Sequence, residues 1–283
     1  MCFSISEINF GGGLFTILQW LVFLVYTVAT YFYWQDFINT KSKQNQRAQN
    51  WFFAAVSLHL ALIIYFAFEN GRVPIATVSE AVSTFVWITA TLYLVIEFKL
   101  KERSQGALIL SVVLILLLQS FLTFDSTAEI NPVLYDIRFE THVLFMLLGY
   151  SGFTLSVIAS ILFLLLYREI QKKELGLFFR KLPSLAYFER ISETAINVGL
   201  IFVSIGFILG FYFATLVWTE SFYLDPKIIV VLLTLIVYIV HLVGRKTGKI
   251  QGKHAALISV IGFVLILFSF FIVSKVIPGA HQF

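Results

Sequence analysis

The sequence predicts an all-α polytopic membrane protein, and its composition and its apolar patterning both support this. The 283-residue chain is 59% hydrophobic and only 13% charged, whereas soluble domains are about 45–50% apolar and about 25% charged. Its mean hydropathy is +0.90 and it contains 31 phenylalanines. Apolar windows of about 20 residues, the length that spans a hydrocarbon core as a helix, recur along the chain. These properties exclude an ordinary soluble domain.

Eight apolar segments are long enough to be spans, and together they predict a single membrane domain over residues 1–283. We expect them near residues 13–34, 51–69, 77–98, 106–123, 142–167, 194–217, 228–244 and 255–275. The second and fourth segments are short, and the third begins weakly after Pro74. Seven or nine spans are therefore the alternatives to eight.

The distribution of basic residues predicts the orientation. Sixteen of the 20 lysines and arginines fall in alternate connections, at residues 41–47, 99–103, 168–190 and 245–253. The other four are Arg72, Arg138, Lys227 and Lys275. The positive-inside rule places the basic connections in the cytoplasm and both termini outside it. We expect the bacterial cytoplasmic membrane, with a thylakoid-type membrane as the alternative, and no nucleic-acid partner, because the positive charge is confined to short loops.

Four histidines lie in or beside the predicted spans, where an ionisable side chain is a functional hypothesis. The topology places His142 and His281 at the outer surface. His59 and His241 share a depth, about 12 Å and about 9 Å from the cytoplasmic edge at 1.5 Å per residue. Neutral imidazole is a common haem ligand, so each pair could hold a haem between two axial ligands. Alternatively, each histidine hydrogen-bonds a neighbouring carbonyl or lies in the interface.

Other metal sites receive less support from the sequence. The single cysteine, Cys2, excludes an internal disulfide, a cysteine-based zinc site and a C-x-x-C-H haem attachment within this chain. No His-x-x-His or Glu-x-x-His pairing supports a non-haem metal site.

An aromatic loop precedes the seventh span. It contains Trp218, Phe222 and Tyr223 and is followed by Asp225 and Pro226. These aromatic residues could support a planar porphyrin, or they could form the aromatic belt found at membrane interfaces. Asp225 is expected to cap the next helix, with Pro226 at its first position.

The stretch from Gly206 to His241 resembles the haem-handling module of the CcsA-type cytochrome c assembly protein superfamily. The tryptophan-rich motif of that superfamily runs approximately W-G-x-x-W-x-W-D-P-K-E. Trp218 matches its first tryptophan, and residues 225–227 match D-P-K. The departures are Thr219 for glycine, Phe222 and Leu224 for two tryptophans, and Ile228 for glutamate.

The resemblance extends over nearly the whole chain. Further matches are Pro74, Glu80 and Trp87; His142-Val143 with Gly149-Tyr150; His241; and the Pro-Gly-Ala-His segment at residues 278–281. It implies that His142 and His281 ligate haem b beneath the aromatic loop, for delivery to apocytochrome c with a ResB-like membrane partner. It implies an inner haem site at His241, whereas His59 as the partner of His241 follows from depth. The protein would be a haem transfer factor, at most part of a haem-lyase complex.

The degenerate motif also resembles the HemX-like branch of this superfamily, as does the linker at residues 178–185. That branch implies a membrane regulator of haem biosynthesis, acting on the level of glutamyl-tRNA reductase without ligating haem to cytochromes. A small-solute transporter is a third alternative, but we see no inverted repeat. The G-x-x-x-G spacing of Gly206 and Gly210 is typical of close helix packing.

Overall fold

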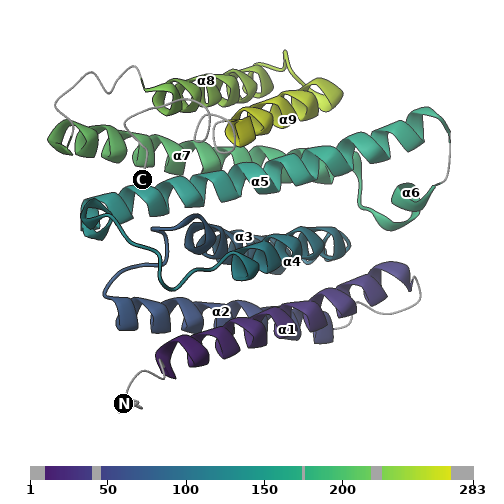
Figure 1. Ribbon diagram of the computed structural model, residues 1–283. Helices are drawn as coiled ribbons and strands as arrows, with labels where there is room; N and C mark the ends of the chain where they lie inside the picture. Colours follow the sequence, from purple (N-terminus) through teal and green to yellow (C-terminus); the bar gives the residue numbers. More distant parts are fainter. Residues whose placement is uncertain (1–9, 40–45, 174–175, 218–224, 269–283) are drawn as a thin grey trace, which may run out of the picture. The chain divides into compact units, whose positions relative to one another are not determined.

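The computed structural model describes residues 10–39, 46–173, 176–217 and 225–268 of the chain. Within these residues the secondary structure is helical and contains no strand. The elements are α1 (Phe10–Ile38), α2 (Gln46–Asn70), α3 (Val78–Leu100), α4 (Gly106–Leu122), η2 (Pro132–Tyr135), α5 (Ile137–Gln171), α6 (Leu177–Lys181), α7 (Leu185–Val217), α8 (Pro226–Lys246) and α9 (Gly252–Phe268) (Figure 1).

The prediction of an all-α polytopic membrane protein is confirmed. Of the described helices, α1, α2, α3, α5, α7 and α8 are long and apolar enough to cross a membrane. The apolar helices α4 and α9 have 17 described residues each, which is about 26 Å at 1.5 Å per residue and lies at the short end for a span. Each of the eight predicted segments corresponds to one of these helices.

Two helices extend well past the predicted segments. α5 has 35 residues and α7 has 33, so each is about 50 Å long, although a hydrocarbon core is only about 30 Å thick. The prediction counted apolar residues, whereas a helix continues into water as long as its backbone hydrogen bonds are made. The extra turn at the start of α5 places His142 in its second turn, not at its first residue.

The chain divides into two compact units, Met1–Ile130 and Asn131–Phe283, and each is described by itself. In the first unit, α1 packs against α2 and α4, and α3 packs against α2 and α4. Large aromatic side chains fill the space between these helices: Tyr26, Tyr33, Phe52 and Tyr93 are all almost fully buried. The rings of Phe52 and Tyr93 are 5.9 Å apart. The first unit is therefore a four-helix bundle with an aromatic core.

In the second unit, α5 packs against α7 and α9, and α8 packs against α7 and α9. The ring of Phe153 on α5 stacks on that of Tyr238 on α8, with centroids 3.8 Å apart. Glycines bring α5 and α7 into close contact: a Cβ atom at Gly152 would lie 2.8 Å from the carbonyl oxygen of Ala195. The close approach of these two helices brings a histidine of α5 to the backbone of α7.

Candidate functional site

His142 lies on α5 and is held against the backbone of α7. Its Nδ1 atom is 2.7 Å from the carbonyl oxygen of Gly206, and the side chain is partly buried. A carbonyl oxygen can only accept a hydrogen bond, so Nδ1 carries the proton and donates. In the neutral ring this tautomer leaves a lone pair on Nε2, which is the atom that can bind a metal.

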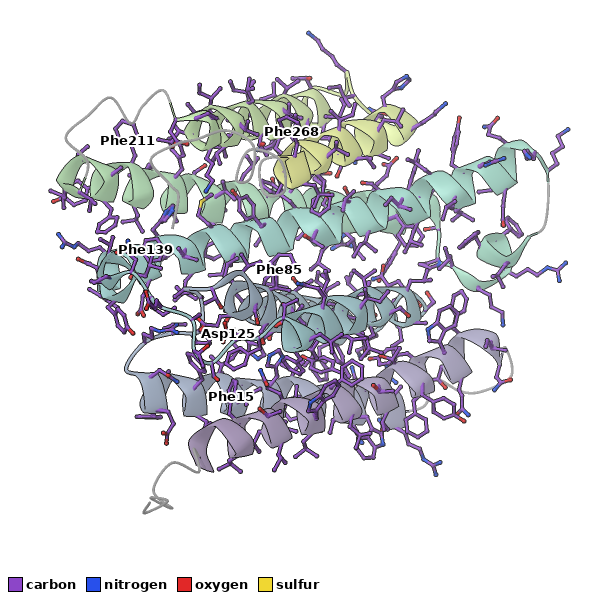
Figure 2. All side chains as sticks on the ribbon, viewed as in Figure 1. Phe15, Phe85, Asp125, Phe139, Phe211 and Phe268 are labelled. Carbon is purple, nitrogen blue, oxygen red and sulfur yellow. The ribbon has the colours of Figure 1, made fainter. Side chains whose placement is uncertain are left out.

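Polar side chains cap the start of α5, which lies just before His142 in the chain. The Asp136 carboxylate accepts a hydrogen bond from the Arg138 backbone N–H at 2.8 Å and caps the helix. The Arg138 side chain also donates to Asp136, and its guanidinium carbon lies 5.6 Å from the centre of the Phe213 ring on α7. Phe139, labelled in Figure 2, contacts the same ring at a centroid distance of 6.2 Å. These contacts join the beginning of α5 to α7.

Asp225 caps α8, as the sequence predicted. Its Oδ1 accepts from the Lys227 backbone N–H at 2.8 Å, and Pro226 occupies the first turn. Asp225 is itself buried. The aromatic residues of the loop and one predicted ligand lie outside the described residues: Trp218, Phe222, Tyr223 and His281.

His241 lies on α8, in the interior of the second unit, and only 2% of its surface is exposed. Neither ring nitrogen makes a hydrogen bond of good geometry with a described residue, although the backbone of Ala255 is close. The ring borders a small cavity of about 10 Å³ that is lined by residues of α5, α7, α8 and α9. Such a volume admits the centre of about one water molecule. No porphyrin fits between these helices as they stand.

The surroundings of His241 contain charged and hydroxyl side chains. Arg245, one turn further along α8, forms ion pairs with Glu189 at 3.1 Å and Glu193 at 3.2 Å on α7. Deeper in the unit, the hydroxyl groups of Ser156, Ser192 and Ser259 form a chain with successive distances of 2.8 Å. These serines are not distinguishable in the sequence. Small hydroxyl residues occur in many spans, so their types alone carry no signal.

His59 lies in the first unit and is fully buried. Its Nε2 is 3.0 Å from the Ser83 hydroxyl on α3, and the Tyr26 ring meets it edge-on with centroids 5.8 Å apart. Its Nδ1 has no hydrogen-bond partner among the described residues. His59 and His241 belong to different units, so the predicted inner site that they would share stays a prediction from sequence.

The first unit contains a larger cavity, of about 210 Å³, that sequence reasoning did not predict. Phe15 and Asp125, both labelled in Figure 2, are among the residues that line it. An ion pair between Arg72 and Glu80 forms part of its wall, with a shortest distance of 2.6 Å. Both side chains are buried and paired with each other, so their charges are balanced within the wall.

The surroundings of His142 and His241 differ in what they allow. His142 has the fixed tautomer of an imidazole ligand, because a metal-bound histidine generally donates its other N–H to a carbonyl or carboxylate. His241 has nitrogens without partners but too little space for a porphyrin. Among the described residues, no group of three or more His, Cys, Asp or Glu side chains is arranged to hold a metal ion.

Comparison with known proteins supports the same family as the sequence motifs. A family model described as "Cytochrome C assembly protein" matches residues 75–281. Protein HemX of Bacillus subtilis (strain 168) is 24% identical, over 89% of this chain and 92% of that protein, and Protein HemX of Brevibacillus brevis is 25% identical over 88% and 92%. Cytochrome c biogenesis protein CcsA of Chlamydomonas reinhardtii is 29% identical, over 80% of this chain and 65% of that protein. The chain therefore belongs to the cytochrome c assembly protein family.

Proposed function

We propose that this protein binds haem b in the bacterial cytoplasmic membrane and moves it outward for cytochrome c biogenesis. In this proposal His142 and His281 are the axial ligands at the outer surface. The observation that carries the proposal is the hydrogen bond from His142 Nδ1 to the Gly206 carbonyl, since it sets the tautomer in which Nε2 carries the lone pair that an iron would bind. Family membership adds independent support.

The residues of this chain would bind and orient the haem, which supplies the reactive vinyl groups when bound. Trp218, Phe222 and Tyr223 would stack on the ring, and Asp225, which caps α8, would hold the end of their loop. Apocytochrome c would present its thiols to the exposed ring edge, and a ResB-like membrane protein is the proposed partner. The protein would thus act by positioning, as a transfer factor.

His241 is our proposed ligand for haem on its way outward. Its two ring nitrogens lack good partners among the described residues, which suits an imidazole that binds something else. Because the adjoining cavity holds about one water molecule, haem could reach His241 only if the surrounding helices separate.

Two observations favour a second function, the regulation of haem biosynthesis. The alignments with the two HemX proteins cover 92% of each of those proteins, and Phe222 and Leu224 replace two tryptophans of the motif. This chain could therefore be a membrane regulator of haem biosynthesis that binds haem and acts on the level of glutamyl-tRNA reductase. It would then need no thiol acceptor outside the membrane.

Haem binding can be tested on the purified full-length protein. We expect a Soret band after purification or after addition of haem. His142→Ala and His281→Ala should each weaken or shift that band. His254→Ala is the matched control, because His254 is exposed at the start of α9 and should leave the spectrum unchanged. A wild-type protein that neither co-purifies with haem nor binds added haem would overturn the proposal.

Deletion of the gene separates the two functions. The assembly role predicts loss of c-type cytochromes with a normal level of glutamyl-tRNA reductase. The regulatory role predicts a raised reductase level with normal cytochromes. Both quantities should be measured in the same strain, with complementation by wild type and by His142→Ala.

A further inference from the structure

Two glycines of α7, one helical turn apart, lie against the His142 side chain. Gly206 provides the carbonyl oxygen that accepts from Nδ1 at 2.7 Å. Gly210 provides space: a Cβ atom at that position would lie within 3.0 Å of Cε1, Nδ1 and Nε2 of the same ring. The imidazole therefore occupies the volume that any other residue at position 210 would fill.

The other glycines of the α5–α7 contact have different neighbours. A Cβ atom at Gly199 would meet the Phe153 ring at 2.5 Å and the Gly149 carbonyl oxygen at 3.1 Å. One at Gly152 would meet backbone atoms of Ala195 and Gly199. These positions serve close helix packing, the ordinary role of small residues between membrane helices. Among the glycines of this contact, Gly210 is the one whose added Cβ would meet the histidine.

The carbonyl of Gly206 can accept two hydrogen bonds, because its oxygen has two lone pairs. In an α-helix the first donor is the backbone N–H four residues later, at Gly210. The imidazole can approach the second lone pair because position 210 carries no side chain. Hydrogen bonds of this kind fix the ring orientation of a ligating histidine and increase its basicity.

We propose that Gly206 and Gly210 are positioning residues that hold His142 as the Nδ1–H tautomer, with Nε2 directed to the haem iron. The first part concerns the tautomer and the ring position and holds with or without haem. The second part rests on the proposed function. The two glycines of the G-x-x-x-G spacing then hold an imidazole as well as allowing close helix packing. We call this position of the His142 ring against Gly206 and Gly210 the seat.

A double-mutant cycle tests the contact without haem. We expect Gly210→Ala to lower the thermal midpoint of the haem-free protein by a few degrees, because the added methyl group displaces the His142 ring. In a His142→Ala background the same change should be neutral or stabilising, since alanine is a better helix former than glycine. Gly199→Ala should destabilise equally in both backgrounds. Additive effects of Gly210→Ala and His142→Ala on the thermal midpoint would contradict a contact between position 210 and the His142 ring.

The tautomer can be observed directly. We expect the ¹⁵N spectrum of histidine-labelled protein to show a protonated Nδ1 and an unprotonated Nε2 for His142, assigned by its loss in His142→Ala. Gly210→Ala should shift this signal toward a tautomer mixture, and Gly199→Ala should leave it in place. An Nε2–H tautomer in the wild type would contradict the proposed geometry.

Haem titration completes the test and separates the two proposals. Loss of a supporting hydrogen bond to a metal ligand typically costs 10–100-fold in affinity, so we expect a loss of about that size for Gly210→Ala and none for Gly199→Ala. If the wild type binds no haem while the cycle and the tautomer are as expected, the proposed function fails and the seat stands. If haem binds equally well to Gly210→Ala, the role of the two glycines in directing Nε2 to iron is overturned and the proposed function stands.

Discussion

At the scale of single residues, the first unit pairs its buried charges with opposite charges. Arg72 lies 2.6 Å from Glu80, and Arg103 lies 3.5 Å from Glu97. The Tyr33 hydroxyl also donates to Glu97 at 2.6 Å. An isolated charge in a low-dielectric interior is costly. Loss of one partner would leave the other charge buried without compensation, so each pair favours the folded state over a fold that keeps only one partner.

Removal of one partner should therefore cost more than removal of both. We expect Arg72→Met to lower the free energy of unfolding by about 3 kcal/mol. This is the lower end of the range for breaking a buried pair, and we choose it because water in the adjoining cavity can solvate the remaining carboxylate. Adding Glu80→Gln should recover most of this loss. Glutamine leaves no buried charge and can still accept from the backbone N–H of Ala76 and Thr77. Thermal unfolding in detergent measures both, and a double variant as unstable as Arg72→Met would contradict this account.

The cap of α5 should depend on pH. The hydrogen bonds from the Arg138 side chain and backbone lower the pKa of Asp136 from its usual 3.8 to about 2. A depressed carboxyl pKa stabilises the fold above the unfolded value and loses that effect as pH falls through the folded value. We expect the stabilisation by Asp136 to be complete above about pH 4 and to disappear toward pH 2.

The measurement is the thermal midpoint of wild type and of Asp136→Asn between pH 5 and pH 2.5. Asparagine keeps a side-chain oxygen that can cap the helix but has no titrating charge. The difference between the two proteins should shrink as the pH falls. A constant difference would show that the charge of Asp136 does not stabilise the start of α5.

At the scale of elements, the contact between α5 and α7 depends on backbone atoms approaching each other. We expect Gly152→Ala to destabilise the protein by about 1–3 kcal/mol, the typical cost of overpacking, because its Cβ would meet backbone atoms of Ala195 and Gly199 that cannot rotate away. Gly13→Ala is the matched control: position 13 also lies in a helix, but beyond its chain neighbours and its own helix backbone no atom of the described residues lies within 4 Å of its added Cβ. Equal effects at the two positions would rule out overpacking as the cause.

At the scale of the whole molecule, orientation in the membrane is still a prediction from the basic residues. In a Cys2→Ser background, Ser126→Cys and Ser184→Cys introduce one thiol at exposed positions in two different connections. We expect a membrane-impermeant maleimide to label position 126 in intact cells and position 184 only after permeabilisation. The reverse pattern would invert the topology and place His142 on the cytoplasmic side.

Apolar length and helix caps were readable from sequence because they depend on neighbouring residues. Each predicted span corresponds to a helix, and Asp225 with Pro226 begins α8 as expected. Both ends of α5 and the start of α7 were not predicted, because these turns carry charged residues that an apolar window excludes. Asp136 is an example: its capping role extends α5 by one turn beyond the predicted segment.

The candidate site was predictable only in part. His142 and His241 could be selected because histidine is unusual in apolar spans, but their surroundings could not. Gly206 is 64 residues from His142, and the hydrogen-bonded serines of the second unit come from α5, α7 and α9. Such contacts depend on which helix faces pack together, and many arrangements of apolar helices satisfy the same hydropathy pattern.

The sequence by itself determined the solvent of this protein, its helices and the histidines worth testing, because hydrophobicity and residue type are local properties. Only the tertiary structure decided the surroundings of His142 and His241. It places His142 Nδ1 on the Gly206 carbonyl and encloses His241 beside a cavity the size of one water molecule. The physical reason is that the hydrogen-bond partner of an imidazole and the space around it are set by the packing of distant helices.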